Sequence, residues 1–183
     1  VAVLIIVMSV MNGFRTELIT KIVGFNPHIT VQPYDNKIII DELNKSNLNF
    51  ISKNLVLSNS GEAIIIKSNT SKGIILRGYL KGDFSKLEIN NNKNFLGDKE
   101  NLKKNYISIG RELSFTLGLN IGDNISIMSS SGTETIIGSL PKQKTFTVLS
   151  IFESGLIDFD NNIAFINLNT LEEFFNLNIK DRN

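Results

Sequence analysis

Residue types that could carry catalysis are few in this chain, and they lie far apart in the sequence. His28 is the only histidine, and it follows Pro27 at the start of an expected strand. A Ser–His–Asp arrangement would have to use this one imidazole as its base, and a lone histidine is more often structural or exposed than catalytic. Cysteine is absent, which excludes thiolate nucleophiles, thiolate metal sites and disulfides within these residues.

Other patterns that suggest chemistry are incomplete. Asp158 and Asp160, in the sequence DFDNN, resemble the start of a calcium-binding loop, but the glycine needed for its sharp turn is missing. We therefore interpret both residues as solvated carboxylates in a turn. The sequence contains neither a GxxxxGK[ST] phosphate loop nor a GxSxG nucleophile elbow. We expect a protein that is not an enzyme and that uses no cofactor and no metal.

The composition is that of an ordinary globular protein. The 183 residues suffice for one domain or for two small ones with a shared core, and they are 42% hydrophobic and 20% charged. The 19 lysines and arginines nearly balance the 18 aspartates and glutamates, so no overall field attracts nucleic acid or an anionic membrane surface. We expect no nucleic-acid partner.

The N-terminal residues predict a membrane helix that continues into a stalk. Residues 1–11 (VAVLIIVMSVM) are apolar except for Ser9, whereas a complete membrane span needs about 20 such residues. In residues 12–23 the apolar side chains fall on one helical face, and Gly24 and Pro27 then end the helix. This face consists of Phe14, Leu18, Ile19, Ile22 and Val23. We predict the end of a transmembrane helix followed by a stalk helix; the alternative is one buried core helix.

The rest of the chain predicts short strands and helices of an α+β protein. Strands are expected at residues 28–32, 55–57, 62–67, 73–78, 106–109, 124–128, 145–152 and 163–168. Helices are expected at 41–51 and 111–117, and a final helix is expected with Asn169 or Thr170 as its cap and with Leu171, Phe174, Phe175 and Leu177 on its buried face. Residues 81–104 predict an irregular connection with one helical turn. The runs 62–67 and 73–78 should form a hairpin with both faces covered, because neither run alternates cleanly.

Residues 129–144 (SSSGTETIIGSLPKQK) form a segment whose length the fold does not require. They lie between two expected strands, where a hairpin loop needs only about two to five residues. Ile136, Ile137 and Leu140 give the predicted loop an apolar tip. Either this tip folds back onto its own domain, or it contacts a partner. The residues alone leave both possibilities open.

Four segments together resemble the lipoprotein-releasing ABC transporter permeases, which comprise LolC, LolE and the merged form LolF. Residues 7–29 (VMSVMNGFRTELITKIVGFNPHI) are similar to the family's first transmembrane helix as it enters the periplasmic domain. Residues 73–84 (GIILRGYLKGDF) resemble the exit from the first subdomain, and residues 145–175 resemble the block that returns to it. Residues 107–127 (ISIGRELSFTLGLNIGDNISI) match the pattern (I/V)xGxxLAxxLGxxxGDxIxL. The four segments span nearly the whole chain.

The resemblance implies an α+β fold of the MacB-like periplasmic type, preceded by the end of a transmembrane and stalk helix. Residues 1–23 would be this helix. Residues 24–80 and 154–183 would form the βα-type Porter subdomain, and residues 81–153 the inserted, strand-rich Sabre subdomain. The last strand and helix of Porter and three further transmembrane helices would follow beyond residue 183.

The resemblance also implies a role for the long segment. In LolC-like permeases an extended Sabre hairpin, the Hook, captures the soluble carrier LolA, and a polar Pad supports the contact. The Hook would be residues 129–141, and residues 135–144 match the pattern TxxGxLPxQK. The implied carrier-binding residues are Thr135, Ile136, Ile137, Gly138, Leu140 and Pro141 of the Hook and Gln143 and Lys144 of the Pad. Ile136 replaces the proline of LolC-type tips, and Glu134 replaces their aromatic residue.

The function implied is that of a non-catalytic, multi-pass permease subunit of the bacterial inner membrane, with this domain in the periplasm. The implied partners are a LolD-like ATPase, a second permease subunit in a homo- or heterodimer, a LolA-like carrier and a lipoprotein substrate. Two alternatives share the architecture. One is a MacB-like exporter permease for drugs or peptides. The other is an FtsX-like regulatory permease, whose domains are shorter and lack the GD-containing block.

Overall fold

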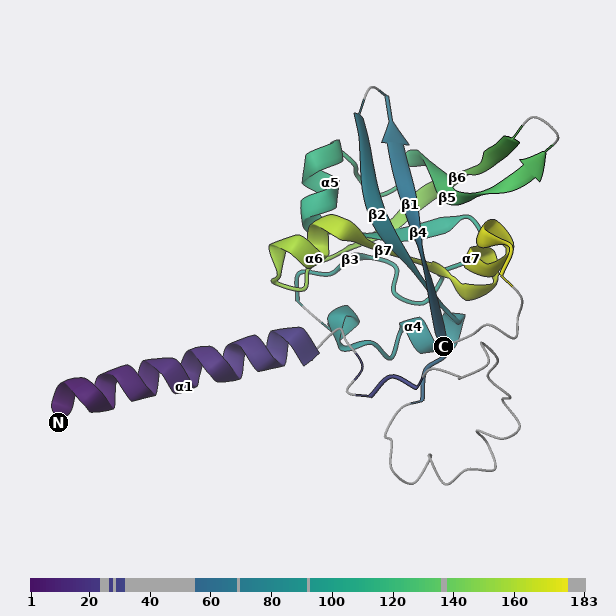
Figure 1. Ribbon diagram of the computed structural model, residues 1–183. Helices are drawn as coiled ribbons and strands as arrows, with labels where there is room; N and C mark the ends of the chain where they lie inside the picture. Colours follow the sequence, from purple (N-terminus) through teal and green to yellow (C-terminus); the bar gives the residue numbers. More distant parts are fainter. Residues whose placement is uncertain are drawn as a thin grey trace, which may run out of the picture.

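A computed structural model of the protein separates one long helix from a sheet-containing body (Figure 1). The structure describes residues 1–23, 27, 29–31, 55–68, 70–91, 93–135 and 138–177. In helix α1 (Ala2–Val23) the stretch Ala2–Ile19 is long and apolar enough to cross a membrane, and none of it is buried. The helix predicted over residues 1–23 is therefore confirmed, and it is not a core helix of the described body.

The body is built on one mixed sheet of seven strands. They are β1 (Ser58–Lys67), β2 (Thr70–Tyr79), β3 (Leu96–Gly97), β4 (Tyr106–Gly110), β5 (Asn124–Thr135), β6 (Gly138–Phe152) and β7 (Ile163–Asn167). Their order is β3-β6-β4-β7-β2-β1-β5, and β5 also pairs with β6, so all strands except β3 close into a ring. The pairs β2–β7 and β4–β6 are parallel, and the other pairs are antiparallel.

Every strand of the ring sends side chains into a single inner cluster. On β1, Ala63 and Ile65 are buried while the intervening Ile64 is half-buried, as expected for a strand with one covered face. The other members include Ile74, Leu76, Ile107, Ile109, Ile125, Ile127, Phe146, Val148, Ala164 and Ile166 from the strands, and Leu113, Leu117, Leu171, Phe174 and Phe175 from two helices. Fully burying one such large side chain contributes about 1.5–3 kcal/mol, so this cluster is the main source of stability.

A second apolar cluster covers the opposite face of β7. Phe165 faces away from Ala164 and packs with Phe84 of helix α4 (Lys81–Phe84). The ring centroids of Phe152 and Phe165 are 4.8 Å apart. Because both of its faces are covered, β7 is buried throughout its first four residues.

The remaining helical elements are short, and all except η1 directly precede or follow a strand. They are η1 (Glu88–Asn91), α5 (Arg111–Leu117), α6 (Ile157–Asn162) and α7 (Leu168–Phe175). Helix α5 agrees with its prediction and ends at Gly118, whose φ of 58° is in the left-handed region. The predicted cap of the last helix at Asn169 or Thr170 is wrong. Asn167 caps α7, because its side chain accepts the N–H of Asn169 at 3.1 Å.

The predicted hairpin is confirmed as β1–β2, which pairs without interruption from Ser58↔Tyr79 to Lys67↔Thr70. The expectation that both of its faces are covered is wrong. Ile75 is 40% exposed between the buried Ile74 and Leu76, because the ring covers only the inner face of β2. The predicted buried residues of the last helix are confirmed: Leu171, Phe174 and Phe175 are buried, and Leu177 is partly buried.

Other predictions for the first half of the chain have mixed outcomes. Residues 55–57 and 29–31 are not in strands, and the helix predicted at 41–51 lies outside the described residues. The irregular character of residues 81–104 is confirmed, since α4, η1 and β3 are its short ordered pieces.

Asp160 is not the solvated turn carboxylate that the sequence suggested. It is only 3% exposed, and its two carboxylate oxygens accept the Ser154 N–H at 2.9 and 3.1 Å. Burial raises the pKa of this carboxyl above its ordinary value. The reason for the error is that Asp160 lies in helix α6, where it faces the loop before the helix, while Asp158 is exposed. The backbone of Asp160 also packs so closely on Gly110 that a Cβ there would lie 2.0 Å from the Asp160 carbonyl oxygen.

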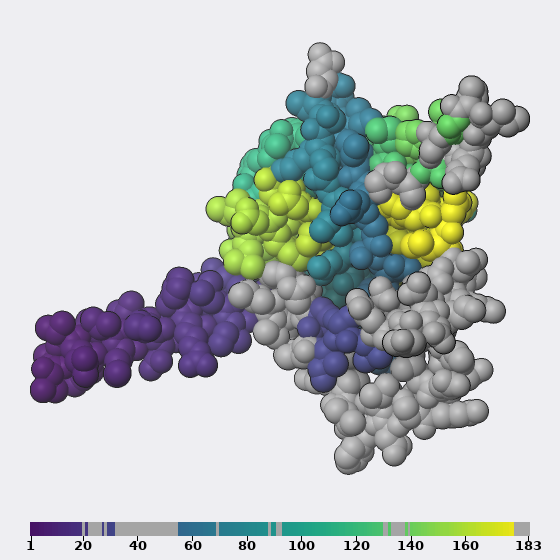
Figure 2. All heavy atoms as spheres, in the orientation of Figure 1, coloured from purple at the N-terminus to yellow at the C-terminus, as the bar shows by residue number. Residues whose placement is uncertain are grey.

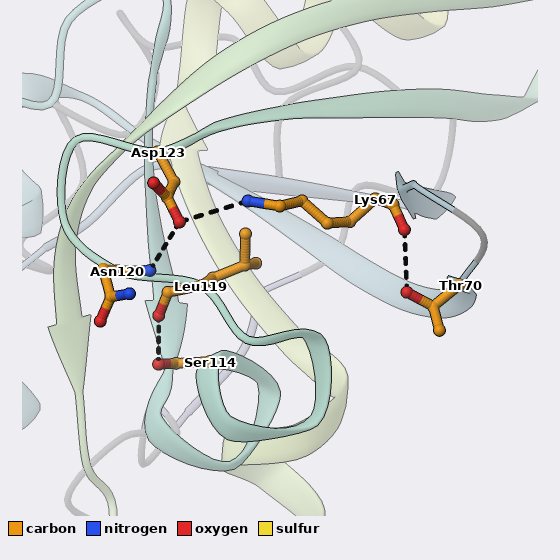
Figure 3. A network of polar contacts seen from close by, with 6 residues as sticks. All are labelled: Lys67, Thr70, Ser114, Leu119, Asn120 and Asp123. Atoms are coloured by element: carbon orange, nitrogen blue, oxygen red, sulfur yellow. Dashed lines mark hydrogen bonds and ion pairs between the residues drawn. The ribbon is translucent and has the colours of Figure 1, made fainter.

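Asp123 holds the turn between α5 and β5 (Figure 3). Its Oδ2 accepts the Asn120 N–H at 3.0 Å and lies 3.2 Å from Lys67 Nζ. Ser114 Oγ donates to the Leu119 carbonyl at 2.7 Å, which fixes the end of α5. These contacts join the tip of the β1–β2 hairpin to the start of β5, so they set where β5 enters the ring.

Asp123→Ala should lower Tm at neutral pH, because the Asn120 N–H and Lys67 lose their acceptor. The Asn120 N–H and, to a smaller extent, Lys67 hold the pKa of Asp123 below its ordinary value of 3.8. A carboxylate with a depressed pKa stabilises the fold above its ordinary pKa and loses this effect as pH falls through the folded pKa. Melting curves of wild type and variant should therefore converge in acid below about pH 3.8. Asp158→Ala, at an exposed carboxylate, is the control; a Tm difference that persists in strong acid contradicts this assignment.

Removal of residues 1–11 should improve solubility without loss of the fold. This part of α1 contributes no buried surface to the body, and its exposed apolar side chains favour aggregation. Size-exclusion chromatography and thermal melting of the shortened chain measure both effects. Unfolding of the shortened chain would show that α1 is needed for the core.

Candidate partner-binding site on the β5–β6 hairpin

The segment predicted as a long loop, residues 129–144, is mostly part of two strands. The β5–β6 ladder runs to Met128↔Gln143 and resumes from Gly132↔Pro141 to Thr135↔Gly138. The loop prediction is wrong because both strands continue past the ring. Their far ends project from the body beside α7 (Figure 1). The space-filling view shows described atoms of β5 and β6 (green) next to α7 (yellow) (Figure 2). We call residues 132–135 and 138–141 the ribbon.

A bulge separates the ribbon from the ring. The shift of register after Met128 leaves residues 129–131 of β5 opposite Lys142 of β6. A bulge bends the strand that carries it and increases its twist. The direction in which the ribbon leaves the body is therefore set at this point.

Both long edges of the ribbon are open in the described structure. Strand β1 pairs with β5 only as far as Ser129, and β4 pairs with β6 only from Thr147 onward. Beyond these positions the strands that the structure describes give β5 and β6 no neighbour except each other. Open edges present unpaired backbone N–H and C=O groups. The ribbon thus offers main-chain groups as well as side chains to a partner.

The face of β6 that fills the ring continues onto the ribbon. At intervals of two residues, Phe146 is buried, Lys144 and Lys142 are half-buried, and Leu140 is 60% exposed. Exposure rises along the strand because the ring ends before the ribbon begins. Leu140 therefore displays apolar surface at the place where the core-facing side of the strand leaves the core.

The two predicted Pad residues lie at the base of the ribbon on opposite faces of β6, because successive strand residues alternate. Gln143 Nε2 donates to Ser126 Oγ on β5 at 2.6 Å. Lys144 Nζ lies 5.6 Å from the ring centroid of Phe146, and burial lowers the pKa of this lysine. Lys144 consequently shares a face with Leu140, whereas Gln143 faces the other way.

The structure brings most of the predicted site residues together along one hairpin. Exposed positions on the ribbon are held by Gly138, Leu140 and Pro141, and Thr135 pairs with Gly138 in the ladder. Ile136 and Ile137 lie outside the described residues, so the contact predicted for them stays a prediction.

Sequence reasoning missed Lys142, which links the hairpin to the body. Its Nζ donates to the Glu173 carbonyl at 3.1 Å and to Asn176 Oδ1, both at the end of α7. These residues are more than 30 positions apart in the chain. No local pattern could have indicated the contact.

The groups that this hairpin exposes are aliphatic, main-chain and basic. Among the residues that the structure describes, no group of three or more His, Cys, Asp or Glu could hold a metal ion. His28 lies outside them. What the ribbon presents is exposed aliphatic surface, open strand edges and a lysine-bearing base.

Leu140→Asp should change the free energy of unfolding by less than about 0.5 kcal/mol, because the side chain is exposed. Phe146→Ala, on the same face of β6 but inside the ring, should cost about 3–5 kcal/mol through the cavity that it leaves. Denaturant unfolding of the two variants measures both values. A loss in Leu140→Asp that approaches the loss in Phe146→Ala would mean that the ribbon packs onto the body.

Comparison with known proteins finds several LolC relatives, although no family model matches the chain. The lipoprotein-releasing system transmembrane protein LolC of Neisseria meningitidis serogroup B is 27% identical over 189 residues, covering 97% of this chain and 44% of the relative. LolC of Xylella fastidiosa (strain Temecula1) is 25% identical, with the same coverages of 97% and 44%. LolC of Haemophilus influenzae is 30% identical over 156 residues, covering 83% of this chain and 38% of the relative. The chain thus spans less than half the length of these relatives.

A fold similarity to a solved structure supports this relation. That structure is the extracellular domain of the noncanonic ABC-type transporter YknZ from Gram-positive bacteria, with a TM-score of 0.50 and 14% identity over 80% of this chain and 71% of that one. The body therefore has the mixed α/β fold of an ABC-transporter extracellular domain. The sequence matches to LolC confirm the resemblance to lipoprotein-releasing permeases that the four sequence segments indicate.

Proposed function

On the premise of this similarity, we propose that the chain is the periplasmic domain, with its preceding membrane helix, of a lipoprotein-releasing ABC permease. Its ribbon docks a soluble, LolA-like carrier. The observation that carries the proposal is the ribbon itself. It consists of the ends of β5 and β6, which extend beyond the pairing of these strands with β1 and β4. It exposes Leu140 on the face of β6 that is buried inside the ring. It also contains most of the residues that match the pattern TxxGxLPxQK.

Helix α1 supports placement in a membrane. Its apolar stretch Ala2–Ile19 has the length and composition of a span and no cover from the body. In this arrangement α1 lies in the bacterial inner membrane, and the sheet-containing body lies in the periplasm. The intact protein is then a multi-pass permease subunit, and this chain comprises one of its membrane helices and a periplasmic part.

The proposed subdomains share one ring of strands. Porter would comprise residues 24–80 and 154–183, and Sabre residues 81–153. Strands β1, β2 and β7 then come from Porter, and β3 to β6 from Sabre. The pairings β1–β5 and β4–β7 cross the boundary between them. Motion of one subdomain would therefore reach the other through the backbone ladder.

A contact between α1 and the body supports mechanical transmission. The Lys21 side chain lies so close to Gly155 that a Cβ on this glycine would be 3.3 Å from Lys21 Cε. The Ser154 N–H in the same loop binds the buried carboxylate of Asp160, whose backbone packs on Gly110 next to α5. Movement of the membrane helix can thus pass to α6 and the ring.

The energy source in this proposal is a separate subunit. The permease is non-catalytic, and a LolD-like ATPase drives it from the cytoplasm together with a second permease subunit in a homo- or heterodimer. A lipoprotein leaves the inner membrane and passes to the carrier held by the ribbon. The residues of this chain contribute binding and transmission to that cycle.

A MacB-like exporter for drugs or peptides and an FtsX-like regulatory permease remain the competing functions. The fold similarity to an ABC-type transporter of Gram-positive bacteria does not distinguish these functions from lipoprotein release, because proteins with one fold can have many functions. The ribbon favours lipoprotein release, since neither rival needs a surface for a soluble lipoprotein carrier.

Calorimetric titration of the chain with a purified LolA-like carrier tests the proposal. Leu140→Asp should weaken binding by about 2 kcal/mol or more, because it would bury an unpaired charge in the contact. This is more than a tenfold loss of affinity, given about 1.4 kcal/mol per factor of ten. The matched control is Ile157→Asp on α6, at an aliphatic residue of similar exposure, 69% against 60%. It should bind like wild type.

Two results would overturn this function. One is wild-type affinity in Leu140→Asp with an intact fold. The other is failure of the wild-type chain to bind the carrier while it copurifies with an export adaptor or with a periplasmic hydrolase, the partners of the competing functions.

A further inference from the structure

Lys142 stands at the only position where the described β5–β6 ladder loses its register. Residues 129–131 of β5 have only this residue opposite them on β6, and regular pairing resumes at Gly132↔Pro141. The side chain is half-buried and reaches away from the hairpin to the last turn of α7. There its Nζ donates to the Glu173 carbonyl at 3.1 Å and to the side-chain oxygen of Asn176.

The end of α7 is well suited to hold a lysine. The last carbonyls of a helix lack donors within the helix, and the negative end of the helix dipole attracts a cation. Asn176 ends α7 in the left-handed conformation, with φ 56° and ψ 32°. Helix α7 is itself fixed, because Leu171 and Phe174 belong to the inner cluster of the ring. Lys142 thus connects the hairpin to a rigid part of the body.

The need for such a connection follows from the open edges. In the described structure, no neighbouring strand pairs with β5 after Ser129 or with β6 before Thr147, apart from their pairing with each other. A bulged two-stranded ribbon that is paired only to itself can bend at the bulge. A side chain that binds α7 at this point restricts the bend.

We propose that Lys142 is a positioning residue that fixes the direction of the ribbon through its bonds to the end of α7. The effect of Lys142 on the direction of the ribbon is inferred from the geometry alone. An effect of Lys142 on carrier docking rests on the proposed function. Lys142 does not need to touch the carrier for this role.

Distance measurements between spin labels test the direction of the ribbon without any partner. The chain contains no cysteine, so Ser139→Cys on the ribbon and Asp158→Cys on α6 give two unique labelling sites. In the full 183-residue chain the wild-type background should give one narrow distance distribution. Lys142→Met keeps the length of the side chain but removes its donors, and it should broaden the distribution. Lys142→Arg keeps donors for both acceptors and should stay narrow.

Asn176→Gly is a second, independent variant. Glycine keeps the left-handed end of α7 and removes only the side-chain acceptor. It should broaden the distribution less than Lys142→Met, because the Glu173 carbonyl remains. Combined with Lys142→Met, it should add nothing, since residues that act through one contact are not additive. An unchanged width in Lys142→Met, or full additivity of the two changes, overturns the inference.

Carrier titration of the same variants separates this inference from the proposed function. If Lys142→Met leaves the ribbon in the docking direction about one third of the time, the apparent Kd should rise about threefold. Lys142→Arg should restore it. A broadened distribution with an unchanged Kd overturns the role of Lys142 in docking. A broadened distribution in a chain whose wild type binds no carrier supports the positioning role and overturns the proposed function.

Discussion

Strand β6 pairs with β4 along one edge and with β5 along the other, and the closed arrangement of the body depends on this double pairing. The strand is 15 residues long; its C-terminal half lies in the ring, and its N-terminal end forms part of the ribbon. Phe146 and Val148 fill the inner cluster, whereas Leu140 stands outside the ring on the same face. Without closure the inner side chains of six strands would face water, and the ribbon would have no fixed origin. The same strand therefore contributes to the core and to the projecting ribbon.

Two lysines connect this ring to the elements around it. Lys21 brings the end of α1 against the loop at Gly155, and Lys142 brings the base of the ribbon against the end of α7. Both side chains are half-buried; Lys21 approaches the loop with its aliphatic stem, whereas Lys142 binds α7 with its charged Nζ. The ring lies between them as the rigid part. The described contacts thus form a continuous path from the membrane-type helix to the projecting hairpin.

Much of the local structure could be predicted from the sequence, and the arrangement could not. Three elements have local signals in the sequence, and all three are confirmed. They are the two isoleucine-rich strands of the first hairpin, the short helix that ends at Gly118, and the apolar face of the last helix. Ring closure is different, because β2 pairs with β7 across more than 80 residues of chain. The burial of Asp160 failed as a prediction for the same reason, since Ser154 and Gly110 around it are set by tertiary packing.

The candidate site shows the same division. Residue types indicated an unusual segment between two strands, and the resemblance to lipoprotein-releasing permeases pointed to a hairpin there. The register shift opposite Lys142 and the bonds of this lysine to α7 depend on the three-dimensional arrangement. The placement of Gln143 and Lys144 on opposite faces follows directly from strand geometry, once the segment is known to be a strand rather than a loop.

The open edges of the ribbon also bear on how copies of this protein behave toward one another. A bare strand edge is a template on which another chain can add a strand, and long flat edges promote fibre growth. Pro141 removes one backbone donor from β6, and prolines in sheets are found on such edges. The bulge twists β5 away from flatness, and Lys142 and Lys144 place positive charge at the base, where two identical copies would repel each other. The same irregularities that break the ladder thus work against strand addition between copies at this hairpin.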